Sequence, residues 1–492
     1  MATSLVCETV TGRTMAELLA ARDAATAADM VELRLDGVVD LDVRAALQRS
    51  PRPAIVTCRP VWEGGSFTGT EQERHAILAD AIDSGAEFVD IEWRAGFDDL
   101  IRRAPTRIVL SMHDFERVPN DLDDRVRAMR DTGAGTIKVA VMAGRLTDTL
   151  PLLPIGREGN AVVIGMGDAG VPTRLLATQF GSRWTYAGRG AAPGQIPAAR
   201  MVDEFHVRRV DRATAVYGVV STNALHSLSP VMHNAAFAAA ALNAVYVPLC
   251  AADFADFRQF ADAIGIEGAS VTIPFKRDAL QAACRADELT QQVGAANTLR
   301  RRGSEWEATN TDVDGFLAPL EEAFPGTIRA ARASVLGAGG AARAVVVALR
   351  SRGATVTVHA RRREQASELE ALGAQVGPWP PAQGSWDLLV NTTPLGGAGL
   401  RDESPLPGAR FDGRLVYDLS YGTGTSALLR DASADGCPGL DGLPMLVAQA
   451  ERQFEWWTGR PPVAGVMRRA AHERLGIRDE TMAAREGTPY TA

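Results

Sequence analysis

The first two hundred residues alternate short apolar segments with stretches of helical composition, and no other feature of the sequence restricts the fold as strongly. Eight such apolar segments occur before about residue 190. Strands that alternate with helices eight times over about 200 residues are typical of a (β/α)8 barrel, a closed parallel sheet surrounded by helices. The predicted strands are residues 5–10, 30–35, 54–58, 88–91, 108–110, 136–141, 161–164 and 184–186.

Polar residues at the strand ends are the next informative feature, because the active site of such a barrel lies at the carboxyl ends of its strands. Polar or charged residues stand at the ends of seven consecutive predicted strands, from the second to the eighth. Solvated loops alone would rarely give so regular a series. We therefore predict one site in the barrel, formed by Glu32 and Arg34, Arg59 and Glu63, Glu92, His113, Lys138, Arg174 and Gln195.

The chain has only two lysines, Lys138 and Lys276, against fifty arginines. Arginine stays protonated near neutral pH, whereas a lysine with a lowered pKa can act as a nucleophile. In segment 136–141, strand alternation points Lys138 away from its branched neighbours and into the barrel. Desolvation there would lower its pKa and favour a free amine able to form an imine with a ketone. The alternative is a structural lysine paired with Glu32 or Glu92.

His113 follows the predicted strand 108–110 and is a natural general acid/base. Such a group contributes roughly 10²- to 10⁴-fold to a rate when its pKa lies near the working pH. The alternative is a structural histidine in a loop. The neighbouring strand carries Lys138, which favours the catalytic interpretation, and Glu63 is available to orient the ring.

These residues lie in five segments that resemble type I 3-dehydroquinate dehydratase, in order, over nearly all of the first 200 residues. The resemblance implies that Lys138 forms a Schiff base with the C3 ketone of the substrate. It also implies that His113 removes the C2 proton and assists loss of the C1 hydroxyl as water, while Glu63 pairs with His113. The segments are residues 32–36, 57–65, 111–115, 137–140 and 192–196.

The same resemblance implies the substrate contacts of the barrel. Arg174 would bind the substrate carboxylate, and a closing loop would carry Gln195. The chain departs from the family at Ala191, where many bacterial members have a serine that contacts substrate. The residues implied to hold the ring hydroxyls are Glu32, Arg34, Arg59 and Gln195.

A second unit begins after a charged segment, residues 206–212, which we interpret as a linker. A strand is predicted at 215–220, and a strand, a Gly-rich turn and a helix begin at residue 334. The turn has the pattern G-x-G-x-x-A, whose glycines let the backbone approach a pyrophosphate at a helix N-terminus. Its residues are Gly337, Ala338, Gly339, Gly340, Ala341 and Ala342.

Arginines follow the next predicted strand, 355–359, where an NAD site would carry an acidic residue for the ribose 2′-hydroxyl. Arg361 and Arg362 favour a 2′-phosphate there, and hence NADP(H). The alternative is a solvated basic turn. Which arginine holds the phosphate stays open, because Arg363 adds a third cation.

Lys276 ends the segment 270–276, in which Pro274 terminates a strand and leaves the lysine at the edge of a cleft. Small and polar residues at 294–298 and 309–312 suggest a ligand wall. Asp312 could orient Lys276 and share its proton, as carbonyl reduction requires. A surface lysine is the alternative.

With residues 226–230, 232–234, 391–396 and 442–449, these segments resemble shikimate dehydrogenase as far as about residue 475. The resemblance implies that Lys276 and Asp312 form a catalytic dyad. It implies substrate contacts from Ser227, Ser229, Thr272, Asn297, Asp312, Tyr421 and Gln449, and cofactor contacts from Gly337, Gly339, Ala342, Arg361, Thr393 and Met445.

Composition restricts the partners and location of the protein. A formal charge of -8 at pH 7 gives no reason to expect nucleic-acid binding. No apolar run approaches the roughly 18 residues of a membrane span, and the first predicted strand begins too early for a cleaved targeting segment. Five scattered cysteines without a CxxC pair indicate reduced thiols. We therefore expect a cytoplasmic protein without a membrane partner or a metal.

Together the resemblances predict a bifunctional shikimate-pathway enzyme, because the product of one reaction is the substrate of the other. The barrel would dehydrate 3-dehydroquinate to 3-dehydroshikimate, and the second half would reduce that ketone to shikimate with NADPH. The predicted domains are the barrel at 1–210, a substrate domain at 214–313 completed by 446–475, a Rossmann domain at 314–445 and a frayed tail at 476–492. The sequence specifies no oligomeric state.

Three alternatives compete with this prediction. The second half could act on quinate with NAD, although the arginines after 355–359 favour NADP. The barrel could be another Schiff-base lyase such as an aldolase, although Arg174 and Gln195 suit a carboxylated cyclic polyol better. A non-catalytic quinate-pathway regulator would have no reason to retain both Lys138 and Lys276.

Overall fold

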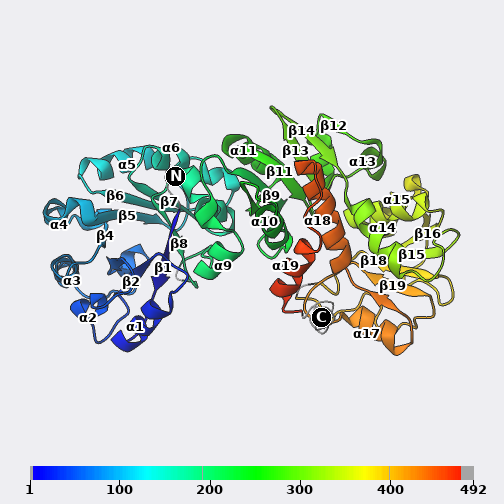
Figure 1. Ribbon diagram of the computed structural model, residues 1–492, viewed down its shortest axis with the longest axis horizontal. Coiled ribbons are helices and arrows are strands. Elements are labelled where there is room, and N and C mark those ends of the chain that lie inside the picture. Colours follow the sequence, from blue (N-terminus) through cyan, green and yellow to red (C-terminus); the bar gives the residue numbers. More distant parts are fainter. Residues whose placement is uncertain (1–3, 191, 398, 478–492) are drawn as a thin grey trace, which may run out of the picture. The chain divides into compact units, whose positions relative to one another are not determined.

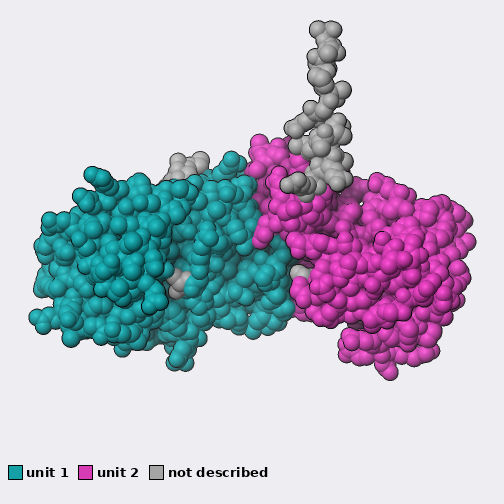
Figure 2. Space-filling view, turned by 90° about the horizontal axis from the view of Figure 1, so that it is seen from below, with its two compact units in different colours: residues 1–227, 243–266 teal, residues 228–242, 267–492 magenta. Residues whose placement is uncertain are grey.

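The computed structural model of the protein describes residues 4–190, 192–397 and 399–477. Ala191 and all of the predicted tail beyond residue 477 lie outside the described residues. The chain separates into two compact units (Figure 2). Unit 1 comprises residues 1–227 and 243–266, and unit 2 comprises residues 228–242 and 267–492.

Unit 1 contains the predicted barrel, an eight-stranded parallel sheet in the order β7-β6-β5-β4-β3-β2-β1-β8 (Figure 1). The junction between the two end strands is bridged by hydrogen bonds: the Arg183 N–H donates to the Ala161 carbonyl at 2.9 Å, and the Val163 N–H donates to Ser182 Oγ at 3.0 Å. The strands are β1 Leu5–Val10, β2 Met30–Arg34, β3 Ala54–Thr57, β4 Phe88–Glu92, β5 Ile108–Asp114, β6 Thr136–Met142, β7 Ala161–Met166 and β8 Trp184–Ala187.

Helices follow the barrel strands, as the alternation of the sequence predicts (Figure 1). Local sequence defines several of their ends; for example, Thr70 and Glu73 form a reciprocal capping box at the start of α3. The helices are α1 Met15–Ala24, α2 Val43–Leu47, α3 Glu71–Asp83, α4 Asp98–Arg103, α5 Leu122–Asp131, α6 Leu152–Arg157, α7 Val171–Leu175, α8 Ala177–Phe180 and α9 Ala198–Asp203.

The interior of the barrel is filled by one side chain in two along each strand. On β6, Ala140 belongs to this core together with Ile55 of β3 and Tyr186 of β8. Lys138 lies two residues before Ala140, so it shares the inward face, and it is 4% exposed. The sequence-based prediction of an inward-facing Lys138 is confirmed.

Two local expectations need correction. His113 is not in a loop after the fifth strand but inside β5, because the ladder with β6 continues and pairs His113 with Ala140. The segment 206–212 is not an extended linker: it contains the short helix η6, Val207–Arg209, and Arg208 binds Asp29 of the barrel with an N–O distance of 2.8 Å.

Two further parallel strands and a helix complete unit 1: β9 Ala215–Ser221, β10 Ala244–Cys250 and α11 Phe254–Ile264. Helix α11 contacts the short helix η4, Leu146–Thr149, which follows β6 of the barrel. Asp256 of α11 is buried there, and its carboxylate accepts the N–H groups of Leu146 at 3.0 Å and Thr147 at 2.9 Å. This carboxylate therefore satisfies the free N–H groups at the start of η4.

Unit 2 contains a second parallel sheet, in the order β17-β16-β15-β18-β19-β20. The Gly-rich turn joins β15 to α15, as the G-x-G-x-x-A pattern predicts, and gives the sheet its Rossmann character. The elements are β15 Arg332–Leu336, α15 Gly340–Ser351, β16 Thr355–His359, α16 Arg363–Ser367, β17 Gln375–Val376, β18 Leu388–Asn391, β19 Leu415–Asp418, α17 Ala427–Ala434 and β20 Gly439–Leu440.

The rest of unit 2 joins segments far apart in the sequence. Helix α18, near the end of the chain, packs against α14 (Figure 1). Ser270 Oγ donates to Gln453 Oε1 of α18 at 2.7 Å. Among the described residues, no helix is both long and apolar enough to cross a membrane. The remaining elements are α10 Ser229–Ala239, β11 Ile266–Val271, α12 Lys276–Ala282, β12 Arg285–Ala286, α13 Glu288–Val293, β13 Thr298–Arg302, β14 Glu305–Thr309, α14 Asp312–Ala323, α18 Leu443–Thr458 and α19 Val466–Leu475.

Candidate active sites

One pocket at the barrel mouth brings together all eight barrel residues to which sequence analysis assigned a role. They come from six different strands or the loops that follow them, so the tertiary fold and not sequence proximity assembles them. The pocket is lined by these eight, Glu32, Arg34, Arg59, Glu63, His113, Lys138, Arg174 and Gln195, together with neighbours that include Thr9, Phe115 and Tyr186.

Lys138 is held between two carboxylates at the base of this pocket. Its Nζ lies 3.0 Å from Glu32 Oε1 and 3.1 Å from Asp90 Oδ2, and 4.2 Å from the centre of the Tyr186 ring. Sequence analysis considered Glu32 and Glu92 as partners; Glu32 is one, but the second is Asp90. A buried lysine with two carboxylate partners has an acceptor at hand for the proton it must lose before it attacks a ketone.

Glu63 and His113 form the neighbouring pair. Glu63 Oε1 accepts the backbone N–H of His113 at 3.0 Å and lies 3.0 Å from His113 Nδ1. Burial raises the pKa of Glu63 to about 7, although the Arg59 cation opposes the shift. Burial, with the nearby cations of Arg59 and Lys138, holds the pKa of His113 well below its ordinary range. His113 is therefore neutral near pH 7, the form that a general base requires.

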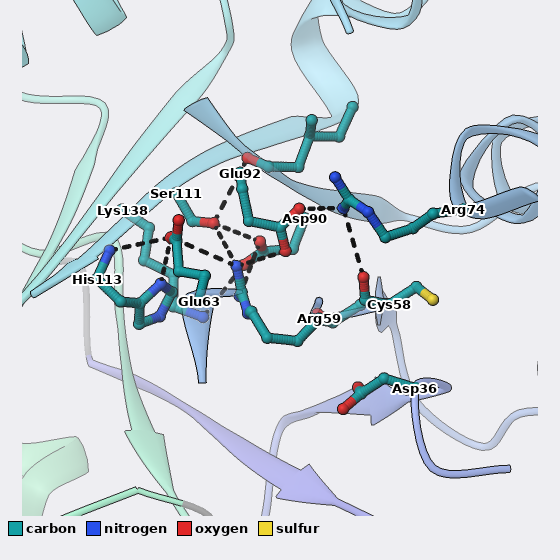
Figure 3. A network of polar contacts seen from close by, with 12 residues as sticks. Asp36, Cys58, Arg59, Glu63, Arg74, Asp90, Glu92, Ser111, His113 and Lys138 are labelled. Carbon is teal, nitrogen blue, oxygen red and sulfur yellow. Dashed lines mark hydrogen bonds and ion pairs between the residues drawn. The ribbon is translucent and has the colours of Figure 1, made fainter. Parts of the chain in front are cut away.

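A network of buried charges surrounds Arg59 (Figure 3). Arg59 donates to Asp90 at 2.9 Å, to Glu92 at 2.7 Å and to Ser111 Oγ at 2.8 Å. Arg74, from α3, pairs with Glu92 from the far side. Burial raises the pKa of Asp90, but the cations of Arg59 and Lys138 outweigh it, so the net shift is downward. Asp90 thus links Arg59 to Lys138.

Sequence reasoning missed Asp90 and the supporting role of Arg74. The signal for Asp90 was present, since Asp90 and Glu92 alternate with the apolar Val89 and Ile91 on β4 and so share one face. Arg74 lies on a helix, where a charged residue ordinarily indicates a solvent face, yet it is fully buried.

Arg174 differs from the other cations of the pocket because no carboxylate pairs with it among the described residues. It is 2% exposed, its Nε has no hydrogen-bond partner, and its other nitrogens reach only backbone carbonyls at 3.2 and 3.5 Å. Burial lowers the pKa of Arg174 to about 10. A buried guanidinium without a counter-ion is suited to bind an anionic ligand group.

Arg34 and Gln195 stand at the rim of the pocket. Arg34 forms a bidentate ion pair with Asp36, in which Nε donates to Oδ1 at 2.8 Å and Nη2 donates to Oδ2 at 2.9 Å. Gln195 Oε1 accepts the N–H of Ala192 at 3.2 Å, so the segment that carries Gln195 is folded back on itself.

The second site is a polar cluster in unit 2. Lys276 Nζ lies 2.5 Å from Asp312 Oδ2, which realises the expected dyad. Asn297 Nδ2 donates to the other carboxylate oxygen of Asp312 at 2.8 Å and lies 3.4 Å from Gln449 Oε1. Lys276 is partly exposed, whereas Asp312, Asn297 and Gln449 are buried. The buried residues orient the dyad, and the lysine faces the accessible side.

The Gly-rich turn lies next to Lys276. A side chain at Gly340 would approach Lys276 Cδ to 3.3 Å, and one at Gly337, where φ is 103°, would approach Thr392 Oγ1 to 2.7 Å. Glycine is therefore required at Gly337, whereas the contact at Gly340 is with a flexible side chain. The side-chain-free backbone of the turn leaves a cradle for a phosphate group. Ala341 and Ala342 begin α15. The backbone N–H of Gly337 donates to the carbonyl of His359 at 2.9 Å, so the arginines after β16 follow directly beside this turn.

The remaining predicted residues occupy varied positions. Arg361 and Arg362 are exposed, and Arg362 lines the groove beside the Gly-rich turn. Thr393 donates to Asn391 Oδ1 at 2.7 Å, and Met445 is 8% exposed at the start of α18. Of the predicted substrate contacts, Ser229 is buried, Ser227 and Tyr421 are half-buried, and Thr272 is exposed.

Models of known families match three stretches of the chain: type I 3-dehydroquinase at residues 6–212, the shikimate dehydrogenase substrate binding domain at 219–299, and the shikimate 5′-dehydrogenase C-terminal domain at 442–472. Over 473 residues the chain is 32% identical to the chloroplastic bifunctional 3-dehydroquinate dehydratase/shikimate dehydrogenase of Arabidopsis thaliana, a match that covers 88% of this chain and 78% of the relative. The chain belongs to this bifunctional family.

Shikimate dehydrogenases without the barrel match the second half of this family member. The NADP(+) enzyme of Trichormus variabilis is 36% identical over 289 residues, which cover 54% of this chain and 98% of the relative. A solved shikimate dehydrogenase from Aquifex aeolicus, 31% identical, covers 53% of this chain and 98% of its own, with a TM-score of 0.49. The two family resemblances predicted from sequence are both confirmed.

Proposed function

We propose that this chain catalyses two consecutive reactions of the shikimate pathway: dehydration of 3-dehydroquinate to 3-dehydroshikimate, and NADPH-dependent reduction of 3-dehydroshikimate to shikimate. One observation carries the proposal. Each of the two lysines of the chain lies beside a carboxylate within its own cluster of predicted residues, Lys138 in the barrel pocket and Lys276 beside the Gly-rich turn.

In the barrel, Lys138 attacks the C3 ketone, and loss of water from the resulting carbinolamine gives an imine. The imine draws electrons from C2, so His113 can remove the C2 proton. The electron pair left at C2 expels the C1 hydroxyl, and His113 returns the proton to it, which releases water. Hydrolysis of the imine then frees 3-dehydroshikimate. The Arg174 guanidinium, which has no acidic partner among the described residues, binds the substrate carboxylate.

In the second site, NADPH when bound supplies the hydride that adds to the ketone carbon. The Gly-rich turn fits a dinucleotide, because its glycines leave room for phosphate groups at the N-terminus of α15. Lys276 donates a proton to the ketone oxygen as its charge develops, and Asp312 holds the ammonium in position. The single-function relatives are NADP(+)-dependent shikimate dehydrogenases, which supports this cofactor over NAD.

We also propose the domain boundaries predicted above: a barrel at 1–210, a substrate domain at 214–313 with 446–475, and a nucleotide domain at 314–445. The hydrogen bonds from Gln453 to Thr298 Oγ1 at 3.0 Å and from Trp457 to the Leu299 carbonyl at 2.9 Å support the return of 446–475 to the substrate domain. A cytoplasmic location stays a prediction, which subcellular fractionation would test.

The imine is tested by borohydride reduction in the presence of 3-dehydroquinate, followed by peptide mass spectrometry. We expect a stable adduct on Lys138 of the full chain. The Lys138→Arg variant is the matched control, since it keeps the charge but lacks a usable amine nucleophile. An adduct at another residue, or none in the wild-type protein, would refute the proposed role of Lys138.

A further inference from the structure

The groove beside the Gly-rich turn contains an ion pair that the proposed reduction does not use. Arg277 follows Lys276 on α12, and its Nη2 lies 2.5 Å from Glu368 Oε2 at the end of α16. The ion pair lies in the wall of a cavity of about 390 Å³. The lining residues of this cavity are Arg277, Ala338, Gly339, Gly340, Arg362, Gln365 and Glu368.

The pair joins two different parts of unit 2. Glu368 follows β16 of the nucleotide-binding sheet, whereas Arg277 belongs to a helix outside that sheet. Both side chains are more than half exposed, at 55% for Arg277 and 51% for Glu368. Exposed ion pairs contribute little to stability and exchange partners readily. Glu368 is therefore a replaceable partner for Arg277.

The charges around the cavity favour an anionic ligand. The Arg362 side chain makes no hydrogen bond or ion pair among the described residues, so its guanidinium is available. Arg343, the other nearby cation, is engaged differently, since its Nε donates to the Val293 carbonyl at 2.7 Å. Two arginines thus face the cavity, and the carboxylate of Glu368 is the one acid in its lining.

We propose that Arg277 binds the 2′-phosphate of NADPH, and that Glu368 occupies Arg277 until the cofactor arrives. This inference rests on the proposed NADPH-dependent reduction. The 2′-phosphate falls at the end of the second strand of a Rossmann unit, which here is β16 with Arg362 beside it. A phosphate carries more charge than a carboxylate and displaces Glu368 into solvent. Arg277 and Arg362, which both line the cavity, then hold the phosphate together.

The test measures ligand affinity of the full chain with Arg277→Gln and Glu368→Gln. Adenosine 2′,5′-bisphosphate and 5′-AMP serve as probes, since they differ only in the 2′-phosphate. We expect Arg277→Gln to lower the affinity for the bisphosphate about tenfold, because a charge-assisted contact to phosphate is lost. The affinity for 5′-AMP should fall less than about twofold. Glu368→Gln should tighten the bisphosphate about threefold, because the competing carboxylate is gone.

The double variant tests whether Glu368 acts through Arg277. If it does, adding Glu368→Gln to Arg277→Gln changes nothing; the same gain in both backgrounds would contradict the displacement. A different outcome is that Arg277→Gln lowers the affinities for NADPH and NADH equally and leaves bisphosphate binding unchanged. That result would assign Arg277 to the pyrophosphate and overturn the 2′-phosphate assignment.

The matched control is the exposed pair of Arg352 and Glu321, 2.6 Å apart in the same unit. It lies at the far end of α15, roughly 18 Å from the Gly-rich turn by the rise of a twelve-residue helix. Neutralising either partner should leave both probes unaffected. Dehydratase activity of the barrel checks that each variant folds. If the wild-type protein fails to bind NADPH, the proposed function fails; if it binds NADPH and Arg277→Gln binds equally well, only this inference fails.

Discussion

At the scale of single residues, the barrel site places in contact two groups whose pKa values shift in opposite directions. Glu63 retains its proton to about pH 7, because burial disfavours its charge, while His113 next to it stays neutral. The two titrate as a pair, and the apparent pKa of a rate profile belongs to both. Ionised Glu63 accepts Nδ1–H of His113 and so leaves the other ring nitrogen as the base.

We predict that kcat/KM for dehydration rises with pH on an acid limb near pH 7 and that Glu63→Gln moves this limb to lower pH. The glutamine cannot ionise, so the remaining limb reports His113, whose pKa is low. The plateau of kcat should also fall about 10- to 100-fold, because the ring loses its charged orienting partner. Rates measured between pH 5 and 9 check this, and an unmoved limb would assign it to a different group.

The same shift predicts how stability changes with pH. The pKa of Glu63 is about 7 in the folded chain against an ordinary value of 4.5, so the folded state binds more protons between these values. This contribution to the free energy of unfolding is complete below about pH 4.5 and disappears as the pH rises through 7. Urea unfolding at a series of pH values should show that Glu63→Gln has lost this decline.

How far the sequence predicted the site depends on the residue. Of the nine strand-end residues predicted to form the barrel site, eight line the pocket, because the carboxyl ends of barrel strands converge. The ninth, Glu92, is not in the lining and instead pairs with Arg59 and Arg74. Asp90 was missed although its alternation on β4 was visible, because its role comes from cross-strand contacts with Lys138 and Arg59. The unpaired state of Arg174 could not be read from sequence either, since it depends on every neighbour that the fold brings near.

At the scale of elements, the loop after β6 directly follows the strand that carries Lys138. Its short helix η4 receives its cap from a distant helix: Asp256 of α11 binds the N–H groups of Leu146 and Thr147. No local pattern predicts this contact, since the partners are about 110 residues apart. The sequence did predict the strands that flank the loop, because their apolar residues are contiguous.

We predict that Asp256→Ala lowers the free energy of unfolding of unit 1 by about 1–3 kcal/mol, because buried N–H groups lose a charged acceptor. Chemical denaturation, followed by dehydratase activity, measures the change. Asp83→Asn is the matched control, since Asp83 makes an exposed ion pair with Arg103 in the barrel, and it should change stability by less than about 0.5 kcal/mol. Equal losses in the two variants would show that the cap at η4 has no special role.

At the scale of the whole molecule, each lysine lies in a different compact unit. We predict that Lys138→Ala abolishes NADPH oxidation from 3-dehydroquinate but not from 3-dehydroshikimate. Lys276→Ala should abolish it from both substrates while 3-dehydroshikimate accumulates. A mixture of the two variants should restore the complete conversion, because the intermediate can leave one chain and enter another. Loss of both activities in either single variant would show that the sites depend on each other.

The division into compact units was the least accessible feature to sequence analysis. Residues 243–266 group with the barrel although about 30 residues separate them from its predicted end. That grouping rests on contacts such as those of Asp256 with η4, which follow from side-chain geometry and not from periodicity.

The buried guanidinium of Arg174, which has no carboxylate partner among the described residues, affects the stability of the protein when no substrate is bound. A buried cation without a counter-ion among the described residues weakens the folded state of the barrel. A ligand that binds only the folded form stabilises it by about 2.7 kcal/mol when the ligand concentration is a hundred times Kd. Such a ligand therefore raises the melting temperature. Small organic acids and inorganic anions in the buffer should therefore protect the barrel against heat, and Arg174→Gln should abolish this protection. We therefore expect the dehydratase to be most stable to heat when its substrate is bound and least stable in a medium with few anions.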